Sequence, residues 1–445
     1  MRLHRNLTFA VIDSIRDIFN EGVYADKAVE KALQRDKRWG ARDRKFVAET
    51  IYEIVRWNRL YAEIAEVKVP YDRDNIWRLF TVWCVLRGIP LPDWNQIGDV
   101  PLRRIKGRFD ELSRIRKYRE SIPDWLDELG MQELGEELWT KEIAALNQQA
   151  DVVLRTNTLN TTKEMLQRKL KTEDIETESI PYHPNALKLV ERANVFTTEA
   201  FHEGLFEVQD ASSQLVAAYL DVEPGMKVVD ACAGAGGKTL HLAALMQNKG
   251  QIIAMDIYES KLKKLKIRAR RNKAHNIDLR VIDSTKVIKK LHEKADRVLI
   301  DAPCSGLGVL KRNPDSKWKL QPEFIVEIKK TQQEVLQNYS KMVKPGGKMV
   351  YATCSILPSE NRQQVDLFLT SEAGKNFTFV KGDLCIFGEN VKFLFASFCN
   401  SAKVFSLSAA APAAAFGRYP PSAYSKGILY PPITAPYIAI GACSI

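Results

Sequence analysis

Two short segments of the sequence place a cysteine directly after an apolar, strand-like run. The segment Asp-Ala-Pro-Cys-Ser-Gly-Leu-Gly at 301–308 follows Arg-Val-Leu-Ile, and the segment Ala-Thr-Cys-Ser at 352–355 follows Lys-Met-Val-Tyr. Open parallel sheets bind ligands beyond the carboxyl ends of their strands. We therefore expect the thiols of Cys304 and Cys354 to converge there with the carboxyl group of Asp301. Because thiolates are nucleophiles, this arrangement predicts covalent chemistry.

The elements that must position these residues are short apolar runs separated by helix-length segments, beginning at Lys227. This alternation predicts a parallel sheet with helices on both faces, a Rossmann-like α/β fold. The carboxyl ends of parallel strands share one edge, so acids that end the runs are expected beside the two cysteines. The alternative is that these acids merely end strands at a solvated edge. Four successive runs end in an acid, at Asp230, Asp256, Asp283 and Asp301.

The turn after the first of these runs is rich in glycine and leads into a helix. Glycine lets a ligand approach the backbone closely, and the helix supplies free N–H groups. A P-loop requires glycine five residues before its Gly-Lys pair, where this chain has Cys232, so that phosphate cradle is not expected. Asp256 lies about 20 residues further on, the offset at which an acid binds ribose hydroxyls, and Asp283 is placed to meet the base. Together with these acids, the turn predicts a nucleoside pocket. The turn consists of Cys232, Ala233, Gly234, Ala235, Gly236, Gly237 and Lys238.

The bulk composition limits the class of protein. The chain has 445 residues, 45% of them hydrophobic, which predicts about two to four domains. A formal net charge of +11 favours a polyanionic partner such as nucleic acid. Seven cysteines without CxxC spacing, and no charged and apolar leader, argue for the cytoplasm and against disulfides or a metal site. No apolar run reaches the ~18 residues of a membrane span, and we expect a monomer.

Periodicity divides the chain into four parts. Residues 1–145 show helical stripes, 146–205 a small α/β module opened by a short β-branched run, and 206–385 the predicted sheet. Residues 386–445 are rich in Ala, Ser and Pro with few charges, which predicts an atypical, disordered tail. Two basic runs in the first part fit a solvated helix face and an RNA-phosphate contact equally well. They comprise Arg42, Arg44, Lys45, Arg56 and Arg59, and then Arg103, Arg104, Lys106, Arg108, Arg114, Arg116, Lys117 and Arg119.

The motifs together resemble the Nop/Sun family of RNA (cytosine-5)-methyltransferases. The segments that carry the resemblance are Asp-Ala-Cys-Ala-Gly-Ala-Gly-Gly-Lys at 230–238, Asp-Ala-Pro-Cys-Ser-Gly at 301–306 and Thr-Cys-Ser at 353–355. The match extends from the helical N-terminus to about residue 385. It implies an RNA-binding helical domain similar to the transcription factor NusB, a small connecting module, and a class I methyltransferase domain that uses S-adenosylmethionine. The implied substrate is RNA, either ribosomal or transfer RNA.

The resemblance also assigns roles to individual residues. Cys354 would add to C6 of cytosine, Asp301 would hydrogen-bond the pyrimidine at N3, and Cys304 would release the methylated product. The glycine-rich turn at 232–238, with Asp256, Asp283 and Asp301, would bind the cofactor. The target base must leave its stack. Lys311 and Arg312, just beyond the cysteine loop, are then placed to bind RNA phosphates, whereas the basic side chains of 261–273 are expected to face solvent.

Two other interpretations remain open, and two positions depart from the family. DNA cytosine methyltransferases use a Pro-Cys nucleophile, which here would be Cys304 after Pro303, and Cys354 would then be structural. A non-catalytic RNA-binding or ribosome-assembly module on the same fold is the second alternative. Ala235 replaces the family's usual proline, so a less rigid turn is expected. The family's final strand, which inserts into the sheet, is not recognisable after about Leu384.

Overall fold

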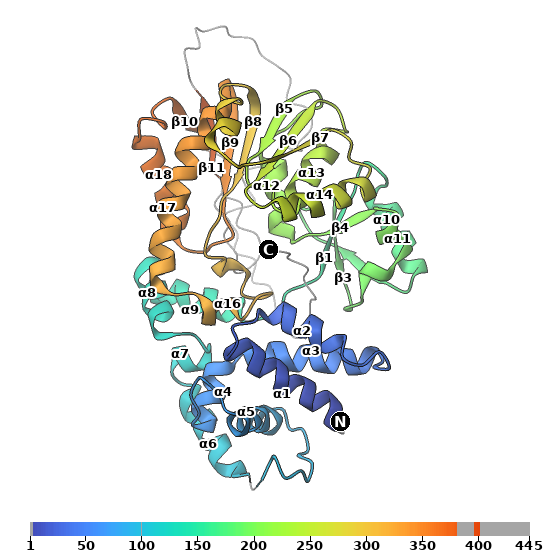
Figure 1. The fold of residues 1–445 in the computed structure, drawn as a ribbon, viewed down its shortest axis with the longest axis vertical. Coiled ribbons are helices and arrows are strands. Elements are labelled where there is room, and N and C mark those ends of the chain that lie inside the picture. The colour runs from blue at the N-terminus through green and yellow to red at the C-terminus, as the bar shows by residue number, and fades with distance from the viewer. Residues whose placement is uncertain (1–2, 99, 381–395, 401–445) are drawn as a thin grey trace, which may run out of the picture.

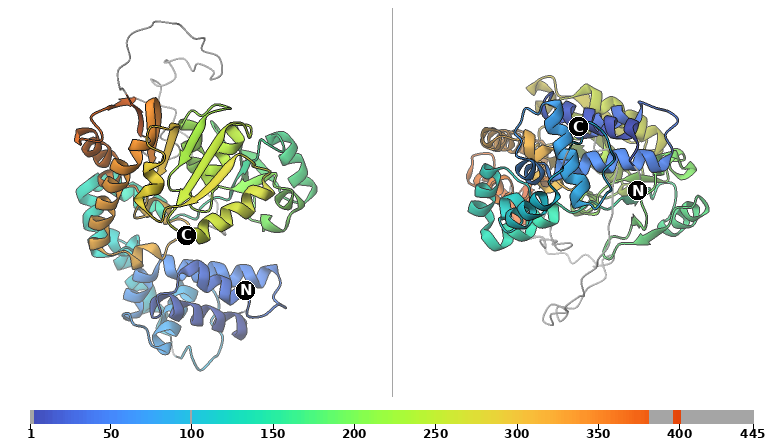
Figure 2. Two further views of the ribbon diagram at one scale, coloured as in Figure 1. Left: turned by 45° about the horizontal axis from the view of Figure 1, so that its top comes forward. Right: turned by 90° about the horizontal axis from the view of Figure 1, so that it is seen from below.

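The computed structural model describes residues 3–98, 100–380 and 396–400. The helices of the N-terminal region lie beneath a part that contains the large sheet, with a small α/β module beside it (Figure 1). The left view of Figure 2 keeps this arrangement, and the right view shows the molecule from below, with the N-terminal helices in front. Within the described residues, no helix combines the length and the apolar character that crossing a membrane requires.

The N-terminal region is helical, as expected, but it divides into two packing units. The first unit buries one core between Leu3 and Leu112. The second unit packs Leu126 and Ile143 against Leu307, Leu310 and Ile356, close to the cysteine loops. The last two helices of this region thus pack onto the sheet-containing part, and the domain boundary at 145 stays a prediction. The helices are α1 (Arg5–Phe19), α2 (Ala25–Leu33), α3 (Ala41–Arg56), α4 (Asn58–Ala65), α5 (Arg73–Leu86), α6 (Leu102–Leu112), α7 (Arg116–Arg119), α8 (Asp124–Leu134) and α9 (Glu136–Leu146).

The small module is an antiparallel sheet of the order β2-β3-β1-β4. Its helices cover a core that includes Leu154, Leu166 and Phe206. The Thr162 side chain caps the first helix by accepting the N–H of Met165 at 3.3 Å. The elements are β1 (Val153–Thr156), α10 (Lys163–Thr172), β2 (Thr177–Ser179), β3 (Ala186–Leu189), α11 (Glu199–His202) and β4 (Phe206–Val208).

The large sheet has the order β10-β11-β9-β8-β5-β6-β7, and β9, β8, β5, β6 and β7 are parallel. This confirms the predicted Rossmann-like α/β fold. The strands are β5 (Lys227–Asp230), β6 (Gln251–Asp256), β7 (Ile277–Val281), β8 (Ala295–Asp301), β9 (Val343–Ala352), β10 (Phe377–Val380) and β11 (Ala396–Asn400). The helices are α12 (Ala211–Tyr219), α13 (Gly237–Leu245), α14 (Glu259–Arg271), α15 (Thr285–Lys289), α16 (Ser316–Lys319), α17 (Pro322–Tyr339) and α18 (Arg362–Thr370).

Strand residues point alternately to two apolar layers, because successive side chains of a strand face opposite sides. In β8, Leu299 packs into the layer of α12, α13 and α14, whereas Val298 and Ile300 pack into the layer of α15, α17 and α18. Both faces of the sheet are thus covered (Figure 1). This explains why its strands are continuous apolar runs.

The end of the chain corrects one expectation. Strand β11 inserts between β9 and β10 and is antiparallel to both. The expectation that no strand from this part of the chain enters the sheet is therefore wrong for residues 396–400. Residues 381–395 and 401–445, with the rest of the expected tail, lie outside the described residues.

Candidate active site

Cys304 and Cys354 lie in loops that leave the carboxyl ends of the neighbouring parallel strands β8 and β9. Their Sγ atoms are 3.3 Å apart, and the backbone N–H of Cys354 donates to Cys304 Sγ at 3.3 Å. The N–H of Gly308 donates to the carbonyl of Cys354 at 2.8 Å and joins the loops a second time. The structure thus brings the two thiols together, as the strand-end placement predicts.

The two thiols differ in acidity. The hydrogen bond from the Cys304 thiol lowers the pKa of Cys354, and the Lys238 ammonium acts in the same direction. The same hydrogen bond, together with burial, raises the pKa of Cys304 well above its ordinary value. Cys354 is therefore the thiol that ionises first, while Cys304 keeps its proton. Since the thiolate is the reactive form, this asymmetry favours Cys354 as the nucleophile.

A charged pair stands beside the thiols. Lys238 Nζ lies 2.5 Å from Asp301 Oδ2, and Asp301 is the last residue of β8. Lys238 was expected to bind the cofactor as part of the glycine-rich turn. Its amine contacts the acid of the cysteine loop and so couples the turn electrostatically to the predicted catalytic residues, and its cofactor role stays a prediction.

The glycine-rich turn joins β5 to α13 and requires glycine at position 236. A Cβ there would lie 2.0 Å from Leu265 Cδ1, and the φ angle is +90°. Gly234 also has a positive φ angle, +55°, but a Cβ there would meet nothing within 4 Å. The turn is thus packed tightly against α14 on one side and open on the other. The open side fits the close approach of a nucleoside-bearing cofactor such as S-adenosylmethionine.

The expected cofactor acids occupy different environments. Asp256 ends β6 and accepts the backbone N–H groups of Gly234 at 2.9 Å and Tyr258 at 2.8 Å, which ties this strand end to the turn. Asp283 lies beyond β7, is exposed, and accepts a hydrogen bond from Ser284 Oγ at 2.9 Å. Burial and the carboxylates of Asp230, Asp301 and Asp256 raise the pKa of Cys232, so its thiol stays protonated. The cofactor roles of these residues remain predictions.

Buried charged side chains, which the sequence analysis did not reveal, form hydrogen bonds with the backbone of the glycine-rich turn. Arg155 Nη1 donates to the carbonyl of Gly237 at 2.7 Å, and Arg268 Nη1 donates to that of Ala235 at 2.7 Å. Both arginines lie near Glu207, whose carboxylate accepts Arg268 Nη2 at 2.8 Å. Arg268 was expected to face solvent, which is wrong for this residue. Its contact also stabilises the turn at Ala235, where a less rigid backbone was expected.

One signal in the sequence could have revealed part of this network. Arg155 follows Val152-Val-Leu directly and is 1% exposed. A charged residue inside an otherwise apolar β-branched run requires buried partners. Glu207 carries the same signal, since it stands between Phe206 and Val208 and is 3% exposed.

The segment after the Cys304 loop docks onto the helical region. Arg56 Nη2 donates to the carbonyl of Lys311 at 2.8 Å, and Trp318 Nε1 donates to that of Val55 at 2.7 Å. Arg312 forms an ion pair with Asp210, and burial lowers the pKa of Lys311. Contact of Lys311 and Arg312 with RNA therefore stays a prediction, and it would require Arg312 to leave its carboxylate.

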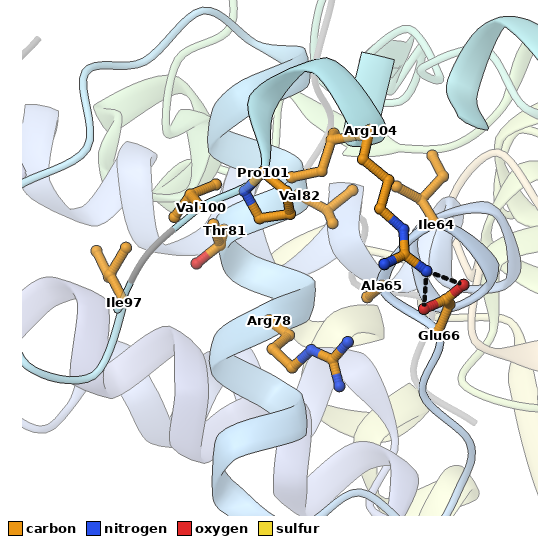
Figure 3. Close-up of a pocket in the computed structure, with 11 residues that line it drawn as sticks. Ile64, Ala65, Glu66, Arg78, Thr81, Val82, Ile97, Val100, Pro101 and Arg104 are labelled. Atoms are coloured by element: carbon orange, nitrogen blue, oxygen red, sulfur yellow. Dashed lines mark hydrogen bonds and ion pairs between the residues drawn. The ribbon is translucent and has the colours of Figure 1, made fainter. Parts of the chain in front are cut away.

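Several residues of the two basic runs also have partners inside the protein. Arg56 is 8% exposed, and Arg116 forms an ion pair with Asp127 at 2.9 Å. Arg104 binds both carboxylate oxygens of Glu66 in a pocket of the helical region whose lining residues include no cysteine (Figure 3). We therefore place the candidate active site at the cysteine loops and not in this pocket.

Two family models match the chain. Residues 217–384 match the model described as 16S rRNA methyltransferase RsmB/F, and residues 122–196 match the ferredoxin-like domain of RsmF/B-like methyltransferases. The second match includes α8 and α9, the helices that pack apart from the N-terminal core. It also includes most of the small module, so it covers parts of two packing clusters.

Individual proteins are similar over most of the chain. The protein named "Probable ribosomal RNA small subunit methyltransferase B" of Synechocystis sp. is 33% identical over 82% of this chain and 88% of its own length. The crystal structure of the protein PH0851 is 26% identical and covers 89% of this chain and 99% of its own, with a TM-score of 0.75. A methyltransferase homologue from Pyrococcus horikoshii is 26% identical and covers 64% of this chain and 97% of its own, with a TM-score of 0.54.

Proposed function

Because the chain belongs to the RsmB/F family of S-adenosylmethionine-dependent rRNA methyltransferases, we propose that it methylates C5 of a cytosine in ribosomal RNA through a covalent adduct with Cys354. The observation that carries the proposal is the 3.3 Å contact between Cys304 Sγ and Cys354 Sγ. In this contact the protonated thiol stabilises the neighbouring thiolate. Two thiols of unequal acidity suit a reaction that needs one nucleophile and one proton carrier.

The first half of the reaction needs the nucleophile. C5 of cytosine is too weakly nucleophilic to take a methyl group directly. The Cys354 thiolate adds to C6, and the electron pair of the C5–C6 double bond moves towards C5 while Asp301 shares a proton with N3 of the ring. Bound S-adenosylmethionine supplies the electrophilic methyl group. The residues that would hold it are the turn at 232–238 and Asp256.

The second half needs a base that was protonated at the start. The pKa of Cys304 is raised mainly by its hydrogen bond to Cys354. Once Cys354 Sγ is bonded to carbon, its negative charge is gone, so the pKa of Cys304 falls and its proton passes to solvent water, which leaves a thiolate. Cys304 then accepts the proton from C5, the C5–C6 double bond re-forms, and the bond between Cys354 Sγ and C6 breaks. The contact between Cys304 Sγ and Cys354 Sγ thus serves both halves of the proposed reaction.

The macromolecular substrate follows from the family and from the site. The reacting thiols lie in loops at the sheet edge, so a base paired within a duplex cannot reach them. A cytosine in a single-stranded segment, or one unpaired by the enzyme, is the proposed target. Relatives named for the small ribosomal subunit favour ribosomal RNA over transfer RNA.

Adduct trapping tests the two cysteine roles. We expect Cys304→Ala to accumulate a covalent protein–RNA complex that survives denaturing electrophoresis, because the nucleophile is intact and release fails. We expect Cys354→Ala to form no complex and no 5-methylcytosine. The reverse pattern would assign the nucleophile to Cys304, as in DNA cytosine methyltransferases. Wild-type protein that binds RNA but neither takes up S-adenosylmethionine in calorimetry nor methylates would instead be a binding module.

A further inference from the structure

Each cysteine of the candidate active site is followed by a serine, and the two Cys-Ser pairs face one another. The sulfur atoms of Cys304 and Cys354 are 3.3 Å apart, and Ser305 Oγ lies 3.2 Å from Ser355 Oγ. Both serines are buried, at 7% and 1% exposed. The two loops therefore meet at a pair of sulfur atoms and, beside it, at a pair of hydroxyl oxygens.

A single carboxylate binds both hydroxyls. Glu360 Oε1 accepts Ser305 Oγ at 2.5 Å and Ser355 Oγ at 2.5 Å. Glu360 Oε2 accepts the backbone N–H of Ser305 at 2.8 Å and Gln332 Nε2 at 3.0 Å. Glu360 is 0% exposed, and burial of a charge is costly unless hydrogen bonds replace its hydration. These four hydrogen bonds come from the two cysteine loops and from α17.

We propose that Glu360 is a positioning residue of the methylation reaction, which holds the Cys304 loop against the Cys354 loop through Ser305 and Ser355. The proposal rests on the proposed function, because it concerns the distance between nucleophile and proton acceptor. Glu360 does not touch either sulfur in the hydrogen bonds of the described residues. It acts through the serine beside each thiol.

The two loops depend on Glu360 to different degrees. Ser355 has further support, since its carbonyl accepts Asn361 Nδ2 at 2.8 Å and its N–H donates to Thr353 Oγ1 at 3.2 Å. Ser305 gives both its N–H and its hydroxyl to Glu360. Gln332 Nε2 supports the same loop by donating to the carbonyl of Pro303 at 2.9 Å, and it is itself bound to Glu360. Loss of the carboxylate therefore displaces Cys304 more than Cys354.

This asymmetry predicts which half of the reaction fails. Cys354 stays at the end of β9 and still adds to C6, so covalent complexes still form. Cys304 no longer lies close enough to accept the C5 proton, so the methylated complex does not break down. Glu360→Ala should thus reproduce, with both cysteines present, the trapped complex expected of Cys304→Ala. General destabilisation of the site would instead reduce complex formation and turnover together.

The experiment compares three substitutions in the full chain with a small-subunit rRNA transcript and S-adenosylmethionine. We expect Glu360→Ala to lower kcat by about 100-fold, the loss that accompanies a misplacement of about 1 Å, and to accumulate a covalent complex. Glu360→Gln should stay within about tenfold of wild type, because hydrogen bonds to a charged acceptor are only about twice as strong as neutral ones. Its amide can donate to the two hydroxyls while its oxygen keeps the two N–H donors.

Glu133→Gln is the matched control. Glu133 also accepts a serine N–H at 2.9 Å and hydroxyl at 2.6 Å, but from Ser359, next to Glu360 in the chain. We expect it to turn over like the wild type and to trap no complex. If Glu360→Ala does not fold, the double variant Ser305→Ala, Ser355→Ala removes both hydroxyl contacts, keeps the charge, and should trap the same complex.

The outcomes separate this inference from the proposed function. If Cys304→Ala traps a complex while Glu360→Ala and the serine double variant lose turnover without trapping, the positioning role is wrong and the cysteine roles stand. Full activity of Glu360→Ala would also overturn the inference. If Cys304→Ala traps nothing and Cys354→Ala still methylates, the proposed function itself fails.

Discussion

Gly308 offers a sharp test of how closely the two cysteine loops must approach. Its N–H donates to the carbonyl of Cys354 at 2.8 Å, and a Cβ at this position would lie 2.7 Å from the same oxygen. Its φ angle is not positive, so Gly308→Ala adds a steric contact without backbone strain. The new methyl group must therefore push the backbone of the predicted nucleophile away from the Cys304 loop.

The size of the effect follows from the distances. Ordinary contact begins near 3.4 Å, so the Cys354 carbonyl must retreat by about 0.7 Å from its position 2.7 Å from the new Cβ. Misplacement of about 1 Å costs roughly 100-fold in rate. We therefore expect kcat to fall between about 10- and 100-fold, or ~1.4 to 2.7 kcal/mol of transition-state stabilisation. Overpacking of a tight site also lowers the free energy of unfolding by about 1–3 kcal/mol.

The assay is methyl transfer from radiolabelled S-adenosylmethionine to an rRNA transcript, with kcat and KM determined separately. KM for the cofactor should change little, because Gly308 lies outside the turn at 232–238. Gly107→Ala is the matched control, since a Cβ at that glycine of α6 would meet nothing within 4 Å and its φ angle is also not positive. Wild-type kcat for Gly308→Ala would refute the idea that the reaction depends on this loop separation.

Three further predictions concern the charged groups of the site. Lys238→Met should move the pH profile of kcat/KM, and of iodoacetamide alkylation at Cys354, to higher pH. The pKa of this thiol is lowered first by its thiol neighbour and then by the Lys238 ammonium, so the variant loses the second contribution. Burial raises the pKa of Asp230 to about 7 from 3.8. The folded state therefore binds this proton more tightly, and stability falls as pH rises from about 4 to 7. Asp230→Asn should accordingly lose less Tm than the wild type between pH 5 and pH 8. Arg268→Ala should weaken S-adenosylmethionine binding in calorimetry by about tenfold, the value of one charge-assisted hydrogen bond, because the Ala235 carbonyl loses its donor.

Each of these predictions has an outcome that contradicts it. An unchanged pH profile of alkylation in the Lys238 variant would show that its charge does not reach the thiol. Equal Tm losses in wild type and Asp230→Asn would show that a group other than Asp230 causes the pH dependence of stability. For cofactor binding, Arg270→Ala is the control, because Arg270 is exposed on the same helix. Equal affinity losses in Arg268→Ala and Arg270→Ala would point to general charge and not to the turn.

The parts of the fold that could be predicted are those with a regular period. Apolar runs such as 298–300 and 349–351 predict buried strands, and parallel strands bring their carboxyl ends to one edge. These two facts predict that Cys304 and Cys354 share one edge of the sheet, and the pairing of β8 with β9 then brings them into contact across 50 residues of chain. Periodicity does not tell which surface a helix packs on, so the docking of α8 and α9 beside the cysteine loops could not be foreseen.

The unpredicted contacts share one physical cause. The loops at the sheet edge leave backbone N–H and carbonyl groups that no ladder of hydrogen bonds satisfies, and buried groups of this kind need partners. Charged side chains from distant elements supply them: Glu360 for the N–H of Ser305, Arg155 for the carbonyl of Gly237, and Arg56 for the carbonyl of Lys311. Sequence pattern cannot pair residues separated by 55, 82 and 255 positions.

The same cause explains why the net charge of the chain overestimates the number of basic side chains that are available to bind RNA. A guanidinium group carries several donors in a rigid fork, so it satisfies clustered loop carbonyls better than neutral side chains do. Arg56 is buried at the carbonyls of Leu310 and Lys311, and Arg268 binds the carbonyl of Ala235. An arginine used in this way adds to the net charge of the chain but has fewer donors to offer a phosphate. The surface that meets RNA must therefore be sought among exposed basic residues such as Arg103 and Lys106, and their substitution should weaken RNA binding and reduce its salt dependence without changing S-adenosylmethionine affinity.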